Sequence, residues 1–167
     1  MMKKINYSVL TFAVLAFALV AVGMDKSTDQ QEKSYEYLDR ELTNAKEFTL
    51  EVFEGMPEED YSFKPGEEMR TFGEQAFHIA YTFEWFNARL SGAPIAWEPG
   101  DESRMSKDEL ITYATDQMDK FIEMVQSSEE SGQLTAAILG TLRHNSHHRG
   151  QMIAYYRANG MTPPSYR

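Results

Sequence analysis

Residues 143–152 read Arg143-His144-Asn145-Ser146-His147-His148-Arg149-Gly150-Gln151-Met152 and hold three of the chain's four histidines. In an α-helix, His144 and His148 are one turn apart and face the same way, so their imidazoles can reach one metal ion. His147 lies about 100° round the helix axis from His148 and is not expected to share that ion. The spacing indicates a metal-binding helix, although two histidines one turn apart also occur on ordinary helix surfaces.

The helix around this stretch is expected to run from about Gln133 to Ala158 and to end at Asn159-Gly160. It carries an apolar stripe and, beside it, a polar arc that would line a site. The apolar stripe consists of Leu134, Ile138 and Met152, and the arc of Ala137, Thr141, His144, His148, Gln151 and Tyr155. Gln151 and Tyr155 are the candidate catalytic residues, because they offer hydrogen bonds beside the histidines. The alternative is that both simply lie on the surface of the bundle.

Three further segments have apolar residues at helical spacing. The first covers residues 28–56 and is ended by Pro57. The second begins with the capping box Thr71-Phe72-Gly73-Glu74 and closes at Ser91-Gly92, and the third begins with the capping box Ser106-Lys107-Asp108-Glu109. No segment has the two-residue period of a β-strand. The sequence therefore predicts an all-α four-helix bundle.

The fourth histidine, His78, lies beside the buried stripe of the second predicted helix. Gln75, Thr82 and Trp85 flank it on its own side of the helix, which suggests the wall of a pocket rather than open solvent. Considered alone, His78 is more typical of a histidine at the boundary of a core than of a metal ligand.

The pattern H-x-x-x-H-R-G-Q at residues 144–151, followed by N-G at 159–160 and P-P at 163–164, resembles the C-terminal signature of the DinB-like superfamily. These proteins also carry a histidine early in the second helix, after a T/S-x-x-E/Q start, and His78 occupies that place. The resemblance covers about residues 28–167. It implies a metal-binding four-helix bundle with long connections between helices and a tendency to dimerise. It also implies that His78, His144 and His148 hold one divalent metal ion.

Composition excludes several classes of function. The chain has a formal net charge of −10 and no basic patch, which argues against nucleic-acid binding. It has no cysteine, so disulfides, thiolate metal sites and cysteine nucleophiles are excluded. Any metal must therefore be held by His, Asp or Glu.

The N-terminus is predicted to be an export signal. Lys3 and Lys4 precede an uncharged stretch at residues 5–24, and Ala21-Val22-Gly23 offers small residues for cleavage after residue 23. Residues 1–23 are then a signal peptide or, if uncleaved, part of an anchor at residues 5–24, although the apolar part is short for a membrane span of about 20 residues. The product would be periplasmic, secreted or membrane-anchored, with residues 24–167 as one domain.

These features favour an exported protein that binds one divalent ion and acts as a metal-dependent, hydrolase-like enzyme on an unidentified small-molecule substrate. Zinc, nickel and iron all accept imidazole ligands, and we expect zinc or nickel first. The alternatives are a non-enzymatic metal-binding or stress-related bundle, a thiol-dependent transferase as in some relatives, and a structural bundle without metal. The non-enzymatic alternative gains support because no carboxylate has a spacing that places it beside the histidines. Glu74 comes nearest, but its capping role already explains it.

Overall fold

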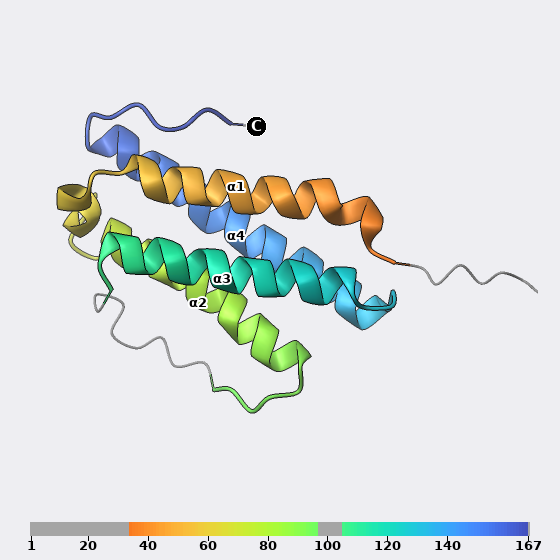
Figure 1. Ribbon diagram of the computed structural model, residues 1–167. Helices are drawn as coiled ribbons and strands as arrows, with labels where there is room; N and C mark the ends of the chain where they lie inside the picture. Colours follow the sequence, from red (N-terminus) through yellow and green to blue (C-terminus); the bar gives the residue numbers. More distant parts are fainter. Residues whose placement is uncertain (1–33, 97–104, 167) are drawn as a thin grey trace, which may run out of the picture. The chain divides into compact units, whose positions relative to one another are not determined.

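A computed structural model describes residues 34–96 and 105–166, and within these ranges the chain contains helices and no β-strand. The four α-helices are α1 (Asp39–Gly55), α2 (Phe72–Leu90), α3 (Lys107–Gln126) and α4 (Gly132–Ala158) (Figure 1). Two short 3-10 helices are η1 (Glu36–Leu38) and η2 (Glu58–Ser62). The predicted all-α fold with four helices is confirmed. The predicted signal peptide lies outside the described residues.

The helices pack so that each one has two main neighbours. Both α1 and α2 pack against α3 and α4, which places α1 diagonally opposite α2. In Figure 1, α2 and α3 run in the same direction, whereas α1 and α4 run in the opposite direction. Two consecutive helices that run in parallel need a long connection. This explains why the chain between Ser91 and Ser106 is so much longer than the turn between Ser127 and Ser131.

Side-chain caps and glycines fix the ends of α2, α3 and α4. The Glu74 carboxylate accepts a hydrogen bond from the Thr71 backbone N–H (2.7 Å), and the Thr71 hydroxyl accepts one from the Glu74 N–H (3.2 Å). The predicted capping box at the start of α3 is also present. Gly92 and Gly160 adopt φ angles of 76° and 73° after α2 and α4, a backbone conformation that residues with a Cβ rarely adopt.

The first helix is shorter than the sequence predicts. The expected segment covered residues 28–56, but α1 begins at Asp39 and residues 36–38 form the 3-10 helix η1. The cause is the fully buried Tyr35, whose hydroxyl is anchored at the start of α4 by the Ser131 backbone (3.1 Å) and by the Thr135 hydroxyl (2.9 Å). These hydrogen bonds hold Tyr35 against the start of α4, so residues 36–38 turn as a 3-10 helix and do not extend α1 towards the N-terminus. Residues 28–33 lie outside the described part.

The core is built from the apolar stripes of all four helices and is rich in aromatic residues. Phe72 makes edge-to-face contacts with Tyr61, Tyr155 and Tyr156, so it joins η2, α2 and α4. Largest among the fully buried side chains are Tyr35, Phe53, Phe72, Phe77, Phe121, Tyr155 and Tyr156. The fold therefore has an extensive apolar core that does not depend on a metal ion.

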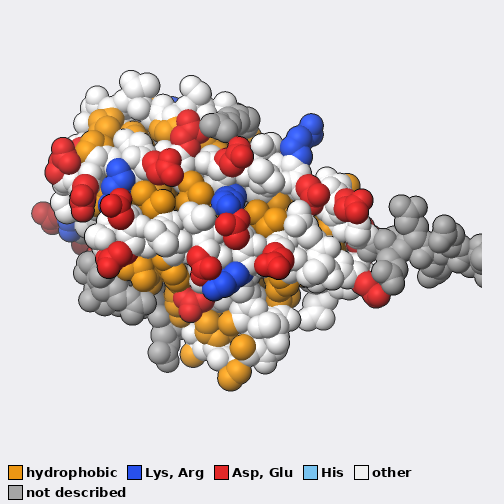
Figure 2. Space-filling model, in the orientation of Figure 1, with side chains coloured by type: hydrophobic (Ala, Val, Ile, Leu, Met, Phe, Trp, Pro, Cys, Tyr) orange, Lys and Arg blue, Asp and Glu red, His pale blue; other side chains and the backbone are white. Residues whose placement is uncertain are grey.

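The surface agrees with the acidic composition. Figure 2 shows Asp and Glu side chains spread over the visible face, with few Lys and Arg among them. None of the helices formed by the described residues is both long and apolar enough to cross a membrane.

Candidate metal centre

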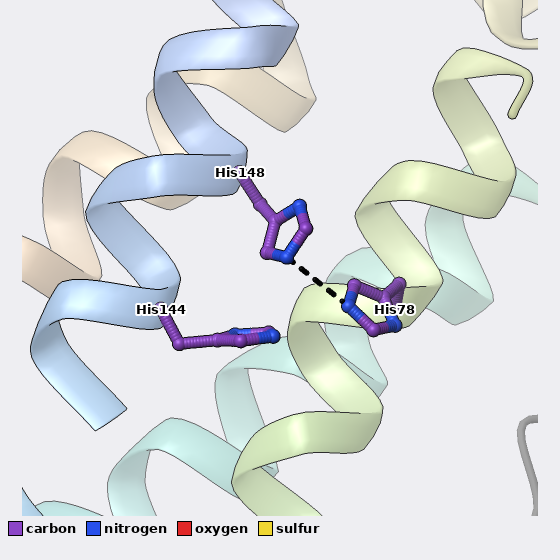
Figure 3. A group of neighbouring side chains, drawn as sticks. All are labelled: His78, His144 and His148. Carbon is purple, nitrogen blue, oxygen red and sulfur yellow. Dashed lines mark hydrogen bonds between the residues drawn. The ribbon is translucent and has the colours of Figure 1, made fainter. Parts of the chain in front are cut away.

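Three histidines from two packed helices converge on one point. His78 lies in the second turn of α2, and His144 and His148 lie one turn apart on the face of α4 that packs against α2 (Figure 3). One ring nitrogen from each residue lies within 4.8 Å of the other two, and the Nε2 atoms of His78 and His148 are 3.2 Å apart. Within residues 34–96 and 105–166, this is the one cluster of three or more potential metal ligands of this kind.

The separation of one pair of donor atoms fits a divalent ion. Two nitrogens that bind one zinc ion at about 2.0–2.1 Å lie roughly 2.8–3.4 Å apart, with the shorter separations for octahedral and the longer for tetrahedral angles. The separation of 3.2 Å between His78 Nε2 and His148 Nε2 falls in this range. His147 does not join the cluster, since it is exposed and its Nε2 lies 3.3 Å from the side-chain nitrogen of Gln151. The three residues that the family resemblance assigns to one ion therefore lie together, and His147 lies outside the group.

The three clustered histidines are held in the neutral form that metal binding requires. Burial, and after it the nearby His148, lowers the pKa of His78 to about 3 and that of His144 to about 4. Burial also lowers the pKa of His148. His78 is only 7% exposed, whereas His144 and His148 are half-buried. At neutral pH the cluster thus offers three unprotonated nitrogens, two of them on side chains that are partly exposed to solvent.

The Gln151 amide orients His148, and Gln75 holds the Gln151 amide. The Gln151 Oε1 lies 2.8 Å from His148 Nδ1, so the Nδ1–H can donate to it and leave the Nε2 lone pair directed at the cluster. Gln75, which precedes His78 by one turn on α2, contacts His148 Nδ1 and donates to Gln151 Oε1 at 3.1 Å. Gln151 was predicted to lie beside the histidines. Gln75 was predicted only as a neighbour of His78, because its contact with α4 depends on how the helices pack.

Tyr155, the other candidate catalytic residue, is part of the core. Its hydroxyl donates to the backbone carbonyl of Arg70 at 2.7 Å, and its ring packs edge-to-face against Phe63 and Phe72. Tyr155 is 2% exposed. These contacts give Tyr155 a clear packing role, and a catalytic role for it stays a prediction.

A second polar cluster joins α4 to α1 and was not predicted. Arg149 Nη1 donates to Asn145 Oδ1 (2.8 Å), to the Thr49 hydroxyl (3.0 Å) and to the Ala45 carbonyl (3.1 Å). Thr49 also donates to Asn145 Oδ1 (3.0 Å). The one signal in the sequence was that Asn145 and Arg149 are one turn apart on the side of α4 away from the histidine arc.

Comparison with known proteins agrees with the fold. The family model of the DinB superfamily matches residues 41–152, a range that includes all three clustered histidines. The crystal structure of a DinB-like protein of Bacillus subtilis, YjoA, is similar with a TM-score of 0.59 and 19% sequence identity, over 78% of this chain and 98% of that one. At this identity the likeness concerns the fold alone. Comparison with curated proteins found no match. Since the family model covers more than half of its length, the chain belongs to the DinB superfamily.

Proposed function

We propose that this protein binds one divalent metal ion through His78, His144 and His148 and uses it as a metal-dependent, hydrolase-like enzyme. The observation that carries the proposal is the convergence of three neutral imidazole nitrogens within 4.8 Å of one another. Zinc or nickel fits this donor set, and iron is the third choice. A bound ion of this kind acts as a Lewis acid that polarises a carbonyl group or lowers the pKa of water.

The protein's own residues would hold and orient the ligands. Three imidazoles leave coordination positions open, and the half-buried His144 and His148 leave the site accessible to a small molecule. Gln151 would fix the tautomer and orientation of His148 through the hydrogen bond at Nδ1. Gln75 would in turn hold the Gln151 amide in place.

A catalytic use of the metal is favoured over a structural one because the core is complete without it. Large apolar side chains from all four helices fill the interior, and metals are usually needed as structural supports only in domains below about 40 residues. Removal of the ion with a chelator should therefore leave the protein folded at room temperature and abolish turnover. A protein that unfolds when the ion is removed would move the assignment to a structural metal site.

A non-enzymatic metal-binding protein is the second candidate. Among the described residues, no Asp or Glu joins the histidine cluster, so the site lacks an evident general base. A panel of esters, amides and thiol conjugates separates the two candidates. Metal-dependent hydrolysis that is lost in His148→Ala and kept in His147→Ala supports the enzyme. Metal binding without turnover on any of the three classes supports the binding protein, and turnover of thiol conjugates alone points to the thiol-dependent transferase.

The cellular location is part of the proposal. Lys3, Lys4 and the uncharged residues 5–24 support export to the periplasm or beyond, or anchoring to the membrane. Low-molecular-weight thiols belong to the cytoplasm, so export favours hydrolysis over a thiol-dependent reaction. N-terminal sequencing of the protein from its native host tests export, and an intact Met1 on soluble cytoplasmic protein would contradict it.

A further inference from the structure

Arg149 carries a buried positive charge on the side of α4 that faces α1. The residue is 9% exposed, and its Nη1 donates to three neutral acceptors: Asn145 Oδ1, the Thr49 hydroxyl and the Ala45 carbonyl. None of the Asp and Glu residues that the structure describes forms an ion pair with it. Arg149 thus differs from most buried charges, which have a partner of opposite sign.

Two nitrogens of this guanidinium have no hydrogen-bond acceptor among the described residues. All three acceptors contact Nη1, whereas Nε and Nη2 form none of the hydrogen bonds found among the described residues. Nε and Nη2 form one of the two donor forks of an arginine, and this fork matches the two oxygens of a carboxylate. Phe48 packs against the guanidinium, with its ring centre 4.7 Å from Cζ. Together with the three hydrogen bonds, this contact fixes the orientation of Arg149.

Two adjoining surface cavities open beside Arg149. Their volumes are about 490 Å³ and about 300 Å³, and both are lined by Phe48, Ser146, Arg149 and Tyr166. Cavities of this size are typical of small-molecule sites. The cavities lie against α1 and the C-terminal segment, whereas the histidines face α2. The two sites therefore lie on different sides of α4.

The lining indicates a ligand with one negative charge and an apolar body. Arg40 and Arg157 add positive charge at the two cavities, although the chain as a whole carries a net charge of −10. The rings of Phe48 and Tyr166 pack edge-to-face at 5.9 Å and supply an aromatic surface next to the guanidinium. Glu41 also lines the larger cavity, 3.8 Å from Arg40. Its carboxylate would repel a doubly charged phosphate more than a single carboxylate.

We propose that Arg149, with Phe48 and Tyr166, forms a binding site for the carboxylate of a small organic acid with an apolar or aromatic body. The carboxylate would accept from Nε and Nη2 of Arg149, and the body would lie against the two aromatic rings. The site is separate from the histidine cluster and does not depend on a metal ion.

Benzoate is a suitable probe, and the experiment uses the full chain treated with a chelator, so that benzoate cannot bind a metal ion. Amide chemical shifts in NMR spectra are followed as benzoate, benzyl alcohol or inorganic phosphate is added. The expected result is saturable binding of benzoate at millimolar concentrations or below, with shifts at residues around Phe48, Ser146 and Tyr166. Benzyl alcohol should bind much more weakly, because it lacks the charge.

Substitutions test the named residues. Arg149→Lys keeps the charge but loses the fork and should weaken benzoate binding about tenfold or more. Tyr166→Ala should weaken it while leaving the fold intact, since Tyr166 is 87% exposed. Arg143→Gln removes an exposed charge of the same helix that lines neither cavity and should have no effect. The proposal is overturned if benzoate does not bind, if phosphate binds in its place, or if Tyr166→Ala and Arg143→Gln behave alike.

Discussion

The Nε2 atoms of His78 and His148 lie 3.2 Å apart, although the two residues are 70 positions apart in the sequence. The packing of α2 against α4 brings them together, and His144 joins them from one turn earlier on α4.

Gln151→Ala is expected to retain the metal but to weaken its binding about 10–100-fold. The reason is that Gln151 Oε1 accepts the hydrogen bond that orients His148, while it contributes no ligand to the cluster. Titration of the apoprotein with zinc in the presence of a competing chelator measures the change. Arg143→Gln, an exposed substitution on the same helix, is the control. Unchanged zinc affinity in Gln151→Ala would show that His148 needs no such support.

Tyr155→Phe should lower the free energy of unfolding by about 1–2 kcal/mol and leave metal binding unchanged. The substitution removes the hydroxyl that donates to the partly buried backbone carbonyl of Arg70. Tyr156→Phe is a matched control, because Tyr156 is equally buried and donates to the carbonyl of Val52 at 2.6 Å. Denaturant unfolding should give similar losses for both variants. If Tyr155 is also catalytic, Tyr155→Phe should slow turnover and Tyr156→Phe should not. Equal turnover rates in the two variants would mean that Tyr155 serves only in packing.

Asn145→Ala should lower the free energy of unfolding by about 1–3 kcal/mol. Asn145 Oδ1 accepts hydrogen bonds from both Arg149 and Thr49, so its removal leaves the buried guanidinium with fewer acceptors. Ser146→Ala, at the exposed neighbouring position, should change stability by less than about 0.5 kcal/mol. Thermal and denaturant unfolding measure both. A loss in Ser146→Ala as large as that in Asn145→Ala would argue against a special role for the polar cluster.

The clustered histidines should make the metal-free protein less stable as the pH falls from about 7 to about 4. Burial lowers the pKa of His78 to about 3 and that of His144 to about 4, whereas each titrates near 6.5 when unperturbed. In this window the unfolded chain binds more protons than the folded chain, so the free energy of unfolding decreases as the pH decreases.

Denaturant unfolding of chelator-treated protein at several pH values tests this dependence. The carboxylates of this acidic chain titrate in the same range, so the useful quantity is the difference between wild type and His78→Gln. The variant should lose less stability on acidification. Parallel pH profiles for the two proteins would mean that His78 does not resist protonation in the folded state.

Much of the fold could be predicted because local signals mark it. The capping boxes at Thr71 and Ser106 and the glycines at positions 92 and 160 fix helix ends through interactions within a few residues. The start of α1 was wrong for the opposite reason. Tyr35 is held by Ser131 and Thr135, and no local pattern reports a contact across that distance in sequence.

The site shows the same division between local and distant contacts. The spacing of His144 and His148 is a property of one helix, and His78 was added through the family resemblance. The contact of Gln75 with His148 and the cluster around Arg149 depend on how α2 and α1 pack against α4. Tyr155 lies on the same arc of α4 as the histidines, but its position nearer the C-terminal end of the helix places its side chain in the core.

The metal content of the purified protein tests the central claim most directly. Full-length wild type, His78→Ala and His147→Ala are each exposed to zinc, nickel or ferrous ions and dialysed extensively, and bound metal is then measured by mass spectrometry. We expect one ion per chain in wild type and in His147→Ala, and none in His78→Ala, because His78 supplies the ligand from α2. A wild-type protein without bound metal, or a His78→Ala variant that retains it fully, would contradict a metal site formed by His78, His144 and His148.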